Sequence, residues 1–308
     1  PGPGQVLIKV AGCGLCHSDF TMRKLPRPIG EQLGWSMPFT LGHETAGWIA
    51  ALGPGVSGFA LDDAVALTAS TSCGSCRFCL RGMDNLCPAS MTGRGYGRDG
   101  GLAEYVLVDN PRGLLKLGSL DPRTAGPLTD AGATAYHAVK RVLPRLLPGG
   151  TAVVIGAGGL GAFAIQFLKV LSAAEVVAAD TNQARLAYAE SLGARTGAIK
   201  RADAVLDFVG THQTIAEGMA AVRPGGAFGL IGSGGGKLDK PWFGALPRDG
   251  EVFTFQGATI ADAQEVIQLA RSGSIRNDVE QFGFDEIDAA YARLAAGGLT
   301  GRAVIVPS

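Results

Sequence analysis

The sequence predicts an α/β protein in which a doubly wound parallel sheet accompanies a mostly antiparallel, barrel-like domain. In the first part of the chain, short β-rich segments at residues 5–10, 46–52 and 64–67 are separated by Gly and Pro turns, a pattern typical of antiparallel barrels. From Thr151 onward, continuous apolar segments alternate with helical patterns, which indicates strands buried on both faces of a parallel sheet. The length of 308 residues fits two domains.

The composition excludes several classes of protein. The formal net charge is zero and the pI is about 7.3, whereas a nucleic-acid binder would carry a basic surplus. No stretch has the roughly 20 apolar residues that cross a membrane. The beginning, Pro1-Gly2-Pro3-Gly4, is neither a signal peptide nor a natural start, so we expect the chain to lack its true beginning. We expect a reducing, cytoplasmic compartment, where closely spaced cysteines bind metal rather than form disulfides.

A cluster of cysteines predicts a structural metal site. Six Cys are present, and four of them fall within a single short segment, residues 72–88: Cys73, Cys76, Cys79 and Cys87. Four thiolates at this spacing can close a tetrahedral zinc site. Because no ligand position is left open, this site is expected to brace its lobe rather than to react.

Two Gly-flanked segments predict a second metal site. Cys16 and His43 offer a thiolate and an imidazole, and catalytic zinc needs three protein ligands and one open position. Asp130, near the expected domain junction, is the best-placed acid for the third ligand. Glu44 and Asp19 adjoin these ligands and are natural hydrogen-bonding partners for them.

A glycine-rich turn predicts a dinucleotide site. A buried strand at residues 151–155 leads directly into a turn and a helix at residues 160–171, and the turn contains Gly156, Gly158, Gly159, Leu160 and Gly161. Asp180 ends the next expected strand, as an acid that binds the ribose hydroxyls does. Thr181 and Asn182 offer no cation for a 2′-phosphate, so NAD is favoured over NADP.

The remaining elements are read from periodicity. A short helix through Arg23 is expected to be capped by Ser18 or Asp19, and residues 26–37 are expected to be irregular.

Only residues 200–203 separate a possible strand at 196–199 from a strand at 204–209. Parallel neighbours need a crossover of roughly a dozen residues. Either these strands are not neighbours, or residues are absent near Lys200. We favour the second alternative, which predicts a break there.

A dinucleotide domain beside a metal-bearing domain indicates hydride transfer assisted by a Lewis acid. In this chemistry zinc lowers the pKa of an alcohol, and the alkoxide gives hydride to the nicotinamide. The predicted cofactors are therefore NAD and two zinc ions per chain, one catalytic and one structural.

At this point the sequence resembles the zinc-dependent medium-chain alcohol dehydrogenases, and most closely the bacterial NAD-dependent secondary-alcohol branch. The resemblance runs over the whole chain and is carried by Gly14-Leu-Cys-His-Ser-Asp19, Gly42-His-Glu44, the four-Cys lobe, Pro127-Leu-Thr-Asp130-Ala-Gly132 and Gly156-Ala-Gly-Gly-Leu-Gly161. It implies a GroES-like catalytic domain at residues 1–131, a Rossmann domain at 132–256 and a return to the catalytic domain at 257–308.

The resemblance also implies roles for single residues. Cys16, His43 and Asp130 match the catalytic zinc ligands, and Glu44 matches an acid that approaches the metal during ligand exchange. Ser18 matches the hydroxyl that passes on the alcohol proton. Many relatives end this relay with a His where Thr21 stands here, so its last step stays open. Positions that match cofactor contacts are Thr134, Val209, Ile231, Phe255 and, at the pyrophosphate, Arg302.

Alternative functions remain open at this stage. A member of the same family could act on primary or aromatic alcohols or on polyols, and residues 26–37 and the regions of Tyr96 and Trp242 would decide this. A zinc-free quinone or enone reductase of this fold would lack the ligand set, and a non-enzymatic use of the fold would show bound zinc without turnover. The expected partner is a small alcohol or ketone, with a homodimer or homotetramer as the assembly and neither nucleic acid nor membrane as a partner.

Overall fold

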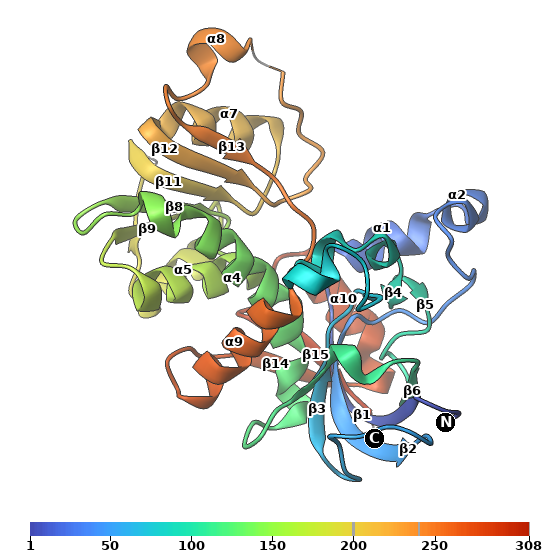
Figure 1. Cartoon of the computed structure of the whole chain (residues 1–308). Coiled ribbons are helices and arrows are strands. Elements are labelled where there is room, and N and C mark those ends of the chain that lie inside the picture. Colours follow the sequence, from blue (N-terminus) through green and yellow to red (C-terminus); the bar gives the residue numbers. More distant parts are fainter. Residues whose placement is uncertain (199–200, 240, 308) are drawn as a thin grey trace. The chain divides into compact units, whose positions relative to one another are not determined.

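The computed structural model describes residues 1–198, 201–239 and 241–307, and its contacts divide the chain into two compact units (Figure 1). Unit 1 consists of Pro1–Ala133 together with Gly257–Ser308, and unit 2 is Thr134–Gln256. The last segment of the chain therefore returns to the unit in which the chain begins.

A seven-stranded sheet forms the centre of unit 1, in the order β14-β15-β1-β2-β3-β7, with β6 also paired to β1. Its pairs are antiparallel except for β14 with β15, so the prediction of a mostly antiparallel domain is confirmed. Its strands are β1 (Val6–Gly14), β2 (Glu44–Leu52), β3 (Ala64–Leu67), β6 (Tyr105–Val108), β7 (Leu114–Lys116), β14 (Val279–Gly283) and β15 (Arg302–Val306).

Alternation in the strands builds the core of unit 1. Val6, Ile8 and Val10 of β1 point to one face and are buried with Ile49 of β2 and Val65 of β3, because successive side chains of a strand point to opposite faces. The sequence analysis missed β14, whose residues are only partly buried or exposed, so that its hydrophobic alternation is weak.

The helices of unit 1 correct two expectations. Residues 26–37 are not wholly irregular, because α2 (Arg27–Gln32) begins after the extended Pro26, and Arg27 pairs with Glu31 one turn later at 2.7 Å. Helix α1 (Ser18–Lys24) has His17 at its N-cap without a side-chain cap, so neither Ser18 nor Asp19 caps it. The further helices that lie wholly in this unit are α3 (Pro122–Ala125), α9 (Ile260–Arg271) and α10 (Ile287–Ala295).

Unit 2 contains the predicted doubly wound sheet of six parallel strands, in the order β10-β9-β8-β11-β12-β13. Helix α5 packs on β8 and β9, and α7 packs on β11 and β12. The strands are β8 (Thr151–Ile155), β9 (Glu175–Ala179), β10 (Arg195–Thr196), β11 (Ala202–Asp207), β12 (Val222–Leu230) and β13 (Glu251–Phe253). The helices are α5 (Gly159–Leu171), α6 (Gln183–Ser191), α7 (His212–Ala221) and α8 (Trp242–Ala245), while α4 (Ala131–Val142) spans the boundary in sequence.

The strands on either side of Lys200 are not neighbours in the sheet. β9 and β8 lie between β10 and β11, which is the first of the two alternatives that the short connection left open. The predicted break at residues 199–200 lies outside the described residues. Among the helices that the structure describes, none is both long and apolar enough to cross a membrane.

Phe228→Ala is expected to lower the free energy of unfolding by about 3–5 kcal/mol. Phe228 is fully buried in unit 2 and packs with Val153, Ile155 and Met219, so truncation leaves a cavity. Phe243→Ala, at a side chain that is 80% exposed, is the control and should change the unfolding free energy by less than about 1 kcal/mol. Urea denaturation followed by circular dichroism measures both values, and equal losses would contradict the assignment of Phe228 to the core.

Candidate metal centres and dinucleotide site

The four cysteines of the predicted structural site come together in unit 1. The sulfur atoms of Cys73, Cys76, Cys79 and Cys87 all lie within 4.8 Å of one another, and all four thiols are free. Three short 3₁₀ turns, Cys79–Arg81, Asp84–Leu86 and Pro88–Met91, fold the segment back on itself. Four sulfur donors in one small volume match the ligand set of structural zinc.

Backbone hydrogen bonds prepare this site for a cation. The N–H of Cys76 donates to Cys73 Sγ at 3.3 Å, and the N–H of Cys79 donates to Cys76 Sγ at 3.5 Å. Hydrogen bonds from the backbone of Ser75 and Cys76 lower the pKa of Cys73 to about 6, which favours the thiolate that binds metal. Arg112 stabilises the lobe through an ion pair in which its Nη2 lies 2.6 Å from Asp84 Oδ1.

A second cluster forms where β1 ends and β2 begins. One ligand atom each of Cys16, His43, Glu44 and Asp130 lies within 4.8 Å of the other three. Antiparallel pairing places Gly14 opposite Glu44, and Cys16 and His43 follow from this register. A Cβ at Gly14 would lie 2.0 Å from Glu44 Oε2, so only glycine permits this approach.

His43 is held between two carboxylates. Its Nε2 lies 3.5 Å from Asp130 Oδ2, and its Nδ1 lies 3.4 Å from Asp19 Oδ1. Asp19 is fully buried, and its Oδ2 accepts hydrogen bonds from the Cys16 N–H at 3.0 Å and the Tyr291 hydroxyl at 3.1 Å. Asp19 therefore lies against the imidazole and holds the backbone of the thiol-bearing residue by a hydrogen bond.

Glu44 forms a buried ion pair with Arg302, and both side chains are at most 4% exposed. The other carboxylate oxygen of Glu44, Oε2, has no hydrogen-bond partner among the residues that the structure describes. Burial raises the pKa of Glu44 well above its usual range, against the charge of Arg302. A metal ion bound among these ligand atoms would compensate this buried carboxylate oxygen for its missing hydrogen bond.

The electrostatics of the cluster favour a cation. Burial opposes ionisation of Asp130, but hydrogen bonding to His43 and the charges of His43 and Arg302 outweigh it and lower the pKa of Asp130. The pKa of Cys16 is lowered as well, because the hydrogen bond and charge of His43 outweigh burial. The thiolate, imidazole and carboxylate set fits zinc, which binds sulfur, nitrogen and oxygen donors.

Ser18 and Tyr96 extend this cluster. The Ser18 hydroxyl lies 2.9 Å from the Tyr96 hydroxyl, which in turn lies 3.4 Å from His43 Nε2. Sequence analysis placed the Tyr96 region at the pocket but did not predict these contacts. The available signal was a tyrosine between two glycines, Gly95 and Gly97. Thr21, the expected position for the end of the relay, is exposed.

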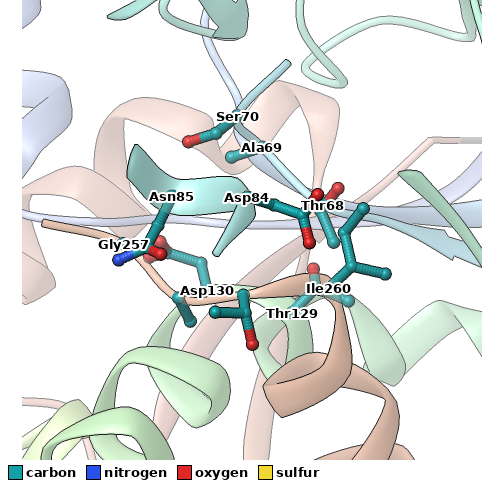
Figure 2. A pocket seen from close by; sticks show the side chains of 11 residues that line it. Thr68, Ala69, Ser70, Asp84, Asn85, Thr129, Asp130, Gly257 and Ile260 are labelled. Atoms are coloured by element: carbon teal, nitrogen blue, oxygen red, sulfur yellow. The ribbon is translucent and has the colours of Figure 1, made fainter. Parts of the chain in front are cut away.

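A pocket opens beside Asp130, and Figure 2 shows Asp84 and Asp130 on its wall. The polar side chains of Thr68, Ser70, Asn85 and Thr129 line it together with small and apolar residues. The full lining consists of Thr68, Ala69, Ser70, Asp84, Asn85, Thr129, Asp130, Gly257, Ala258, Thr259 and Ile260. All of these residues belong to unit 1.

The glycine turn of unit 2 has the geometry that a pyrophosphate needs. Gly156 has φ of 88°, and a Cβ at Gly161 would lie 1.8 Å from the Gly156 carbonyl oxygen. Helix α5 begins at Gly159 after Gly158 as N-cap, with Leu160 in its first turn. The backbone N–H groups in the first turn of this 13-residue helix can therefore face a phosphate.

Asp180 lies beside this turn, and its Oδ2 accepts a hydrogen bond from the Ala157 N–H at 2.8 Å. The sequence reasoning missed Arg185, whose Nη1 lies 3.8 Å from Asp180 Oδ2. It looked for a cation only next to Asp180, whereas Asn182 caps α6 and the first turn of that helix brings Arg185 back. An arginine here adds a positive charge beside the expected ribose position.

The other expected cofactor contacts are distributed as follows. A Cβ at Gly156 would lie 2.7 Å from Val209 Cγ2, so Val209 borders the glycine turn. Thr134 and Ile231 are partly buried in unit 2, and the ring of Phe255 lies 4.6 Å from that of His137. Arg302, expected at the pyrophosphate, is instead buried in the ion pair with Glu44 in unit 1. Its contact with the cofactor stays a prediction.

The fold and the two clusters define a class, the metal-dependent, dinucleotide-dependent oxidoreductases. Residues 2–119 match the family described as alcohol dehydrogenase GroES-like domain, and residues 159–272 match the zinc-binding dehydrogenase family. An NAD-dependent alcohol dehydrogenase of Sulfolobus acidocaldarius is 32% identical over 99% of this chain and 92% of its own length. One of Sulfurisphaera tokodaii is 34% identical over 100% of this chain and 94% of its own length.

Solved structures agree with these relatives. The alcohol dehydrogenase of Aeropyrum pernix superposes with a TM-score of 0.91 at 31% identity, covering 100% of this chain and 93% of that chain. The acetophenone reductase of Geotrichum candidum, solved with NAD, gives 0.88 at 29% identity, with 99% and 90% covered. The chain belongs to the zinc-dependent medium-chain alcohol dehydrogenase family.

Cys79→Ser should lower the zinc content from about two ions per chain to about one, because the buried thiol of Cys79 is one of four closing ligands. Cys13→Ser is the control, since Cys13 is an equally buried thiol outside both clusters. Zinc is measured by plasma mass spectrometry after dialysis. An unchanged zinc content in Cys79→Ser would contradict the structural site.

Proposed function

We propose that this chain oxidises secondary alcohols to ketones and, in the reverse direction, reduces ketones to secondary alcohols. Cys16, His43 and Asp130 are the proposed ligands of its catalytic zinc. As a member of its family, the chain is an NAD-dependent zinc enzyme that interconverts an alcohol and its ketone or aldehyde by hydride transfer. The observation that carries the proposal is the convergence of these three side chains and Glu44 within 4.8 Å.

The residues of unit 1 have different roles around the metal. When bound, zinc acts as a Lewis acid that lowers the pKa of the alcohol. Cys16, His43 and Asp130 would hold it, and the Asp19 carboxylate lies 3.4 Å from Nδ1 of the imidazole, where it orients the ring. Glu44 keeps one free oxygen at the cluster while Arg302 holds the other, so Glu44 can enter or leave the ligand set. Ser18, two residues after Cys16, accepts the alcohol proton at Oγ as it passes its own hydroxyl proton towards the nicotinamide ribose of the bound dinucleotide.

The residues of unit 2 bind and orient the dinucleotide. When bound, NAD accepts the hydride. The N-terminus of α5 holds the pyrophosphate, and Asp180 accepts hydrogen bonds from the adenosine ribose. Val209 borders the glycine turn, and Thr134, Ile231 and Phe255 are proposed to contact the cofactor. The four cysteines of the lobe would hold the second zinc ion, which would stabilise the lobe.

A polyol is the second candidate substrate, because the pocket beside Asp130 offers hydroxyl and amide groups from Thr68, Ser70 and Asn85. Among the relatives is a D-arabinose 1-dehydrogenase of Saccharolobus solfataricus, described as NADP-dependent, at 30% identity over 100% of this chain and 91% of its own length.

The assembly and the compartment are further parts of the proposal. A homodimer or homotetramer is expected from the family, and a reducing, cytoplasmic compartment is supported by six free thiols. Size-exclusion chromatography with light scattering tests the first, and localisation of a tagged chain tests the second.

Asp130→Ala should reduce kcat/KM for alcohols by at least about 100-fold, because it removes a metal ligand. NADH formation at 340 nm is followed with secondary, primary, aromatic and polyhydric alcohols, with and without a chelator. Asp288→Ala, at an exposed position in α10, should retain full activity. Turnover that survives both the chelator and Asp130→Ala would overturn the zinc mechanism, and faster turnover of polyols would favour the second candidate.

Asp180→Gly should shift the preference from NAD towards NADP by about tenfold or more in the ratio of kcat/KM values. The change removes the ribose acceptor and its repulsion of a 2′-phosphate and leaves Arg185 to pair with that phosphate. The double variant Asp180→Gly with Arg185→Ala is the comparison and should lose the gain for NADP. Unchanged cofactor preference in Asp180→Gly would place the ribose elsewhere.

A further inference from the structure

The side chain of Tyr96 lies in the metal cluster without an assigned role. Its hydroxyl is 2.9 Å from Ser18 Oγ and 3.4 Å from His43 Nε2, and its ring centroid is 4.6 Å from that of His43. A phenol hydroxyl can donate one hydrogen bond and accept another. Tyr96 thus contacts both a metal-binding side chain and the hydroxyl proposed to receive the alcohol proton.

The loop around Tyr96 is built to hold it there. Gly95 and Gly97 have φ of 76° and 78°, a conformation that favours glycine. A Cβ at Gly95 would lie 2.6 Å from the backbone of Gly42, directly before His43. A Cβ at Gly97 would lie 2.3 Å from the ring of Trp35. Gly95 therefore lets the loop approach the His43 segment closely, and Gly97 lets it approach Trp35, with Tyr96 between them.

Trp35 braces the other side of the tyrosine. The two rings meet edge to face at 6.4 Å, and the indole N–H of Trp35 donates to the Met91 carbonyl oxygen at 2.9 Å. The ring of Tyr96 is thereby fixed between Trp35 and His43. The sequence analysis left the regions of residues 26–37 and Tyr96 as undecided pocket positions, and these contacts give one of their residues a definite place.

Of the two hydroxyl contacts, the one with Ser18 is available for catalysis. Nε2 of His43 faces Asp130 and is the nitrogen with which this histidine would bind zinc, so it cannot also serve Tyr96. The Ser18 hydroxyl then remains as the polar partner of the phenol. A serine hydroxyl rotates freely unless a partner fixes it, and a misplaced proton acceptor slows general acid–base catalysis.

We propose that Tyr96 is a positioning residue that holds the Ser18 hydroxyl in the orientation from which it takes the alcohol proton. The inference rests on the proposed function and adds a residue that acts through Ser18. It also bears on the relay, because Thr21, where many relatives have a histidine, is exposed. In this chain the Ser18 hydroxyl is fixed from the side of Tyr96 instead.

A double-mutant cycle with Tyr96→Phe and Ser18→Ala tests the proposal. Tyr96→Phe should lower kcat for alcohol oxidation by about tenfold, the effect of one lost hydrogen bond, while KM for the alcohol changes by less than about twofold. Ser18→Ala should lower kcat by about 100-fold or more. The double variant should match Ser18→Ala, because Tyr96 acts only through that hydroxyl. Tyr105→Phe, at a tyrosine 48% exposed, should match the wild type.

Crystal structures of the zinc-loaded wild type and Tyr96→Phe give a readout that does not depend on turnover. The wild type should keep Tyr96 Oη within hydrogen-bond distance of Ser18 Oγ, and Tyr96→Phe should show Ser18 in another rotamer or in several. An unchanged Ser18 rotamer in Tyr96→Phe, or additive losses in the cycle, would overturn the role of Tyr96. A wild type that binds zinc but oxidises no alcohol would overturn the proposed function instead, and the Ser18 rotamers would still decide the contact.

Discussion

The buried ion pair between Glu44 and Arg302 joins the parts of the chain that build the catalytic cluster. Glu44 is the first residue of β2 and Arg302 the first residue of β15. Both strands pair with the end of β1, where Cys13 lies opposite Ile305 and Gly14 opposite both Val304 and Glu44. Removing one partner of such a pair leaves an uncompensated charge and costs about 3–5 kcal/mol. The pair therefore ties the C-terminal strand to the metal site.

This constraint explains why the chain returns to unit 1 after the dinucleotide unit. Arg302 compensates the charge of Glu44 only if β15 lies beside β1, so residues 257–308 must complete the first sheet. Helix α10 follows the same requirement, because the Tyr291 hydroxyl donates to the buried Asp19. The metal cluster thus depends on two side chains, Tyr291 and Arg302, that come 272 and 258 residues later in the chain than their partners.

The sequence could predict what depends on local spacing. The cysteines of the lobe, the glycine turn with Asp180, and the parallel strands of unit 2 follow from patterns within short segments, and the structure contains all three. Contacts made by distant segments could not be predicted in this way. The pairing of Arg302 with Glu44 and the contact of Tyr96 with Ser18 each depend on tertiary packing, whereas Arg185 lies near Asp180 because helix α6 begins between them. Helix α2 was missed, although the proline in its first turn, Pro28, is favourable at that position.

The two metal clusters are prepared by different means, and the difference matches their different tasks. In the cysteine lobe, backbone N–H groups donate directly to sulfur, so the peptide chain itself sets the position of the ligands and all four places are filled. In the second cluster, side chains behind the ligands set their positions, and Glu44 Oε2 stays unpaired. Side-chain support leaves room for one ligand to be exchanged, which a catalytic metal needs and a structural metal does not.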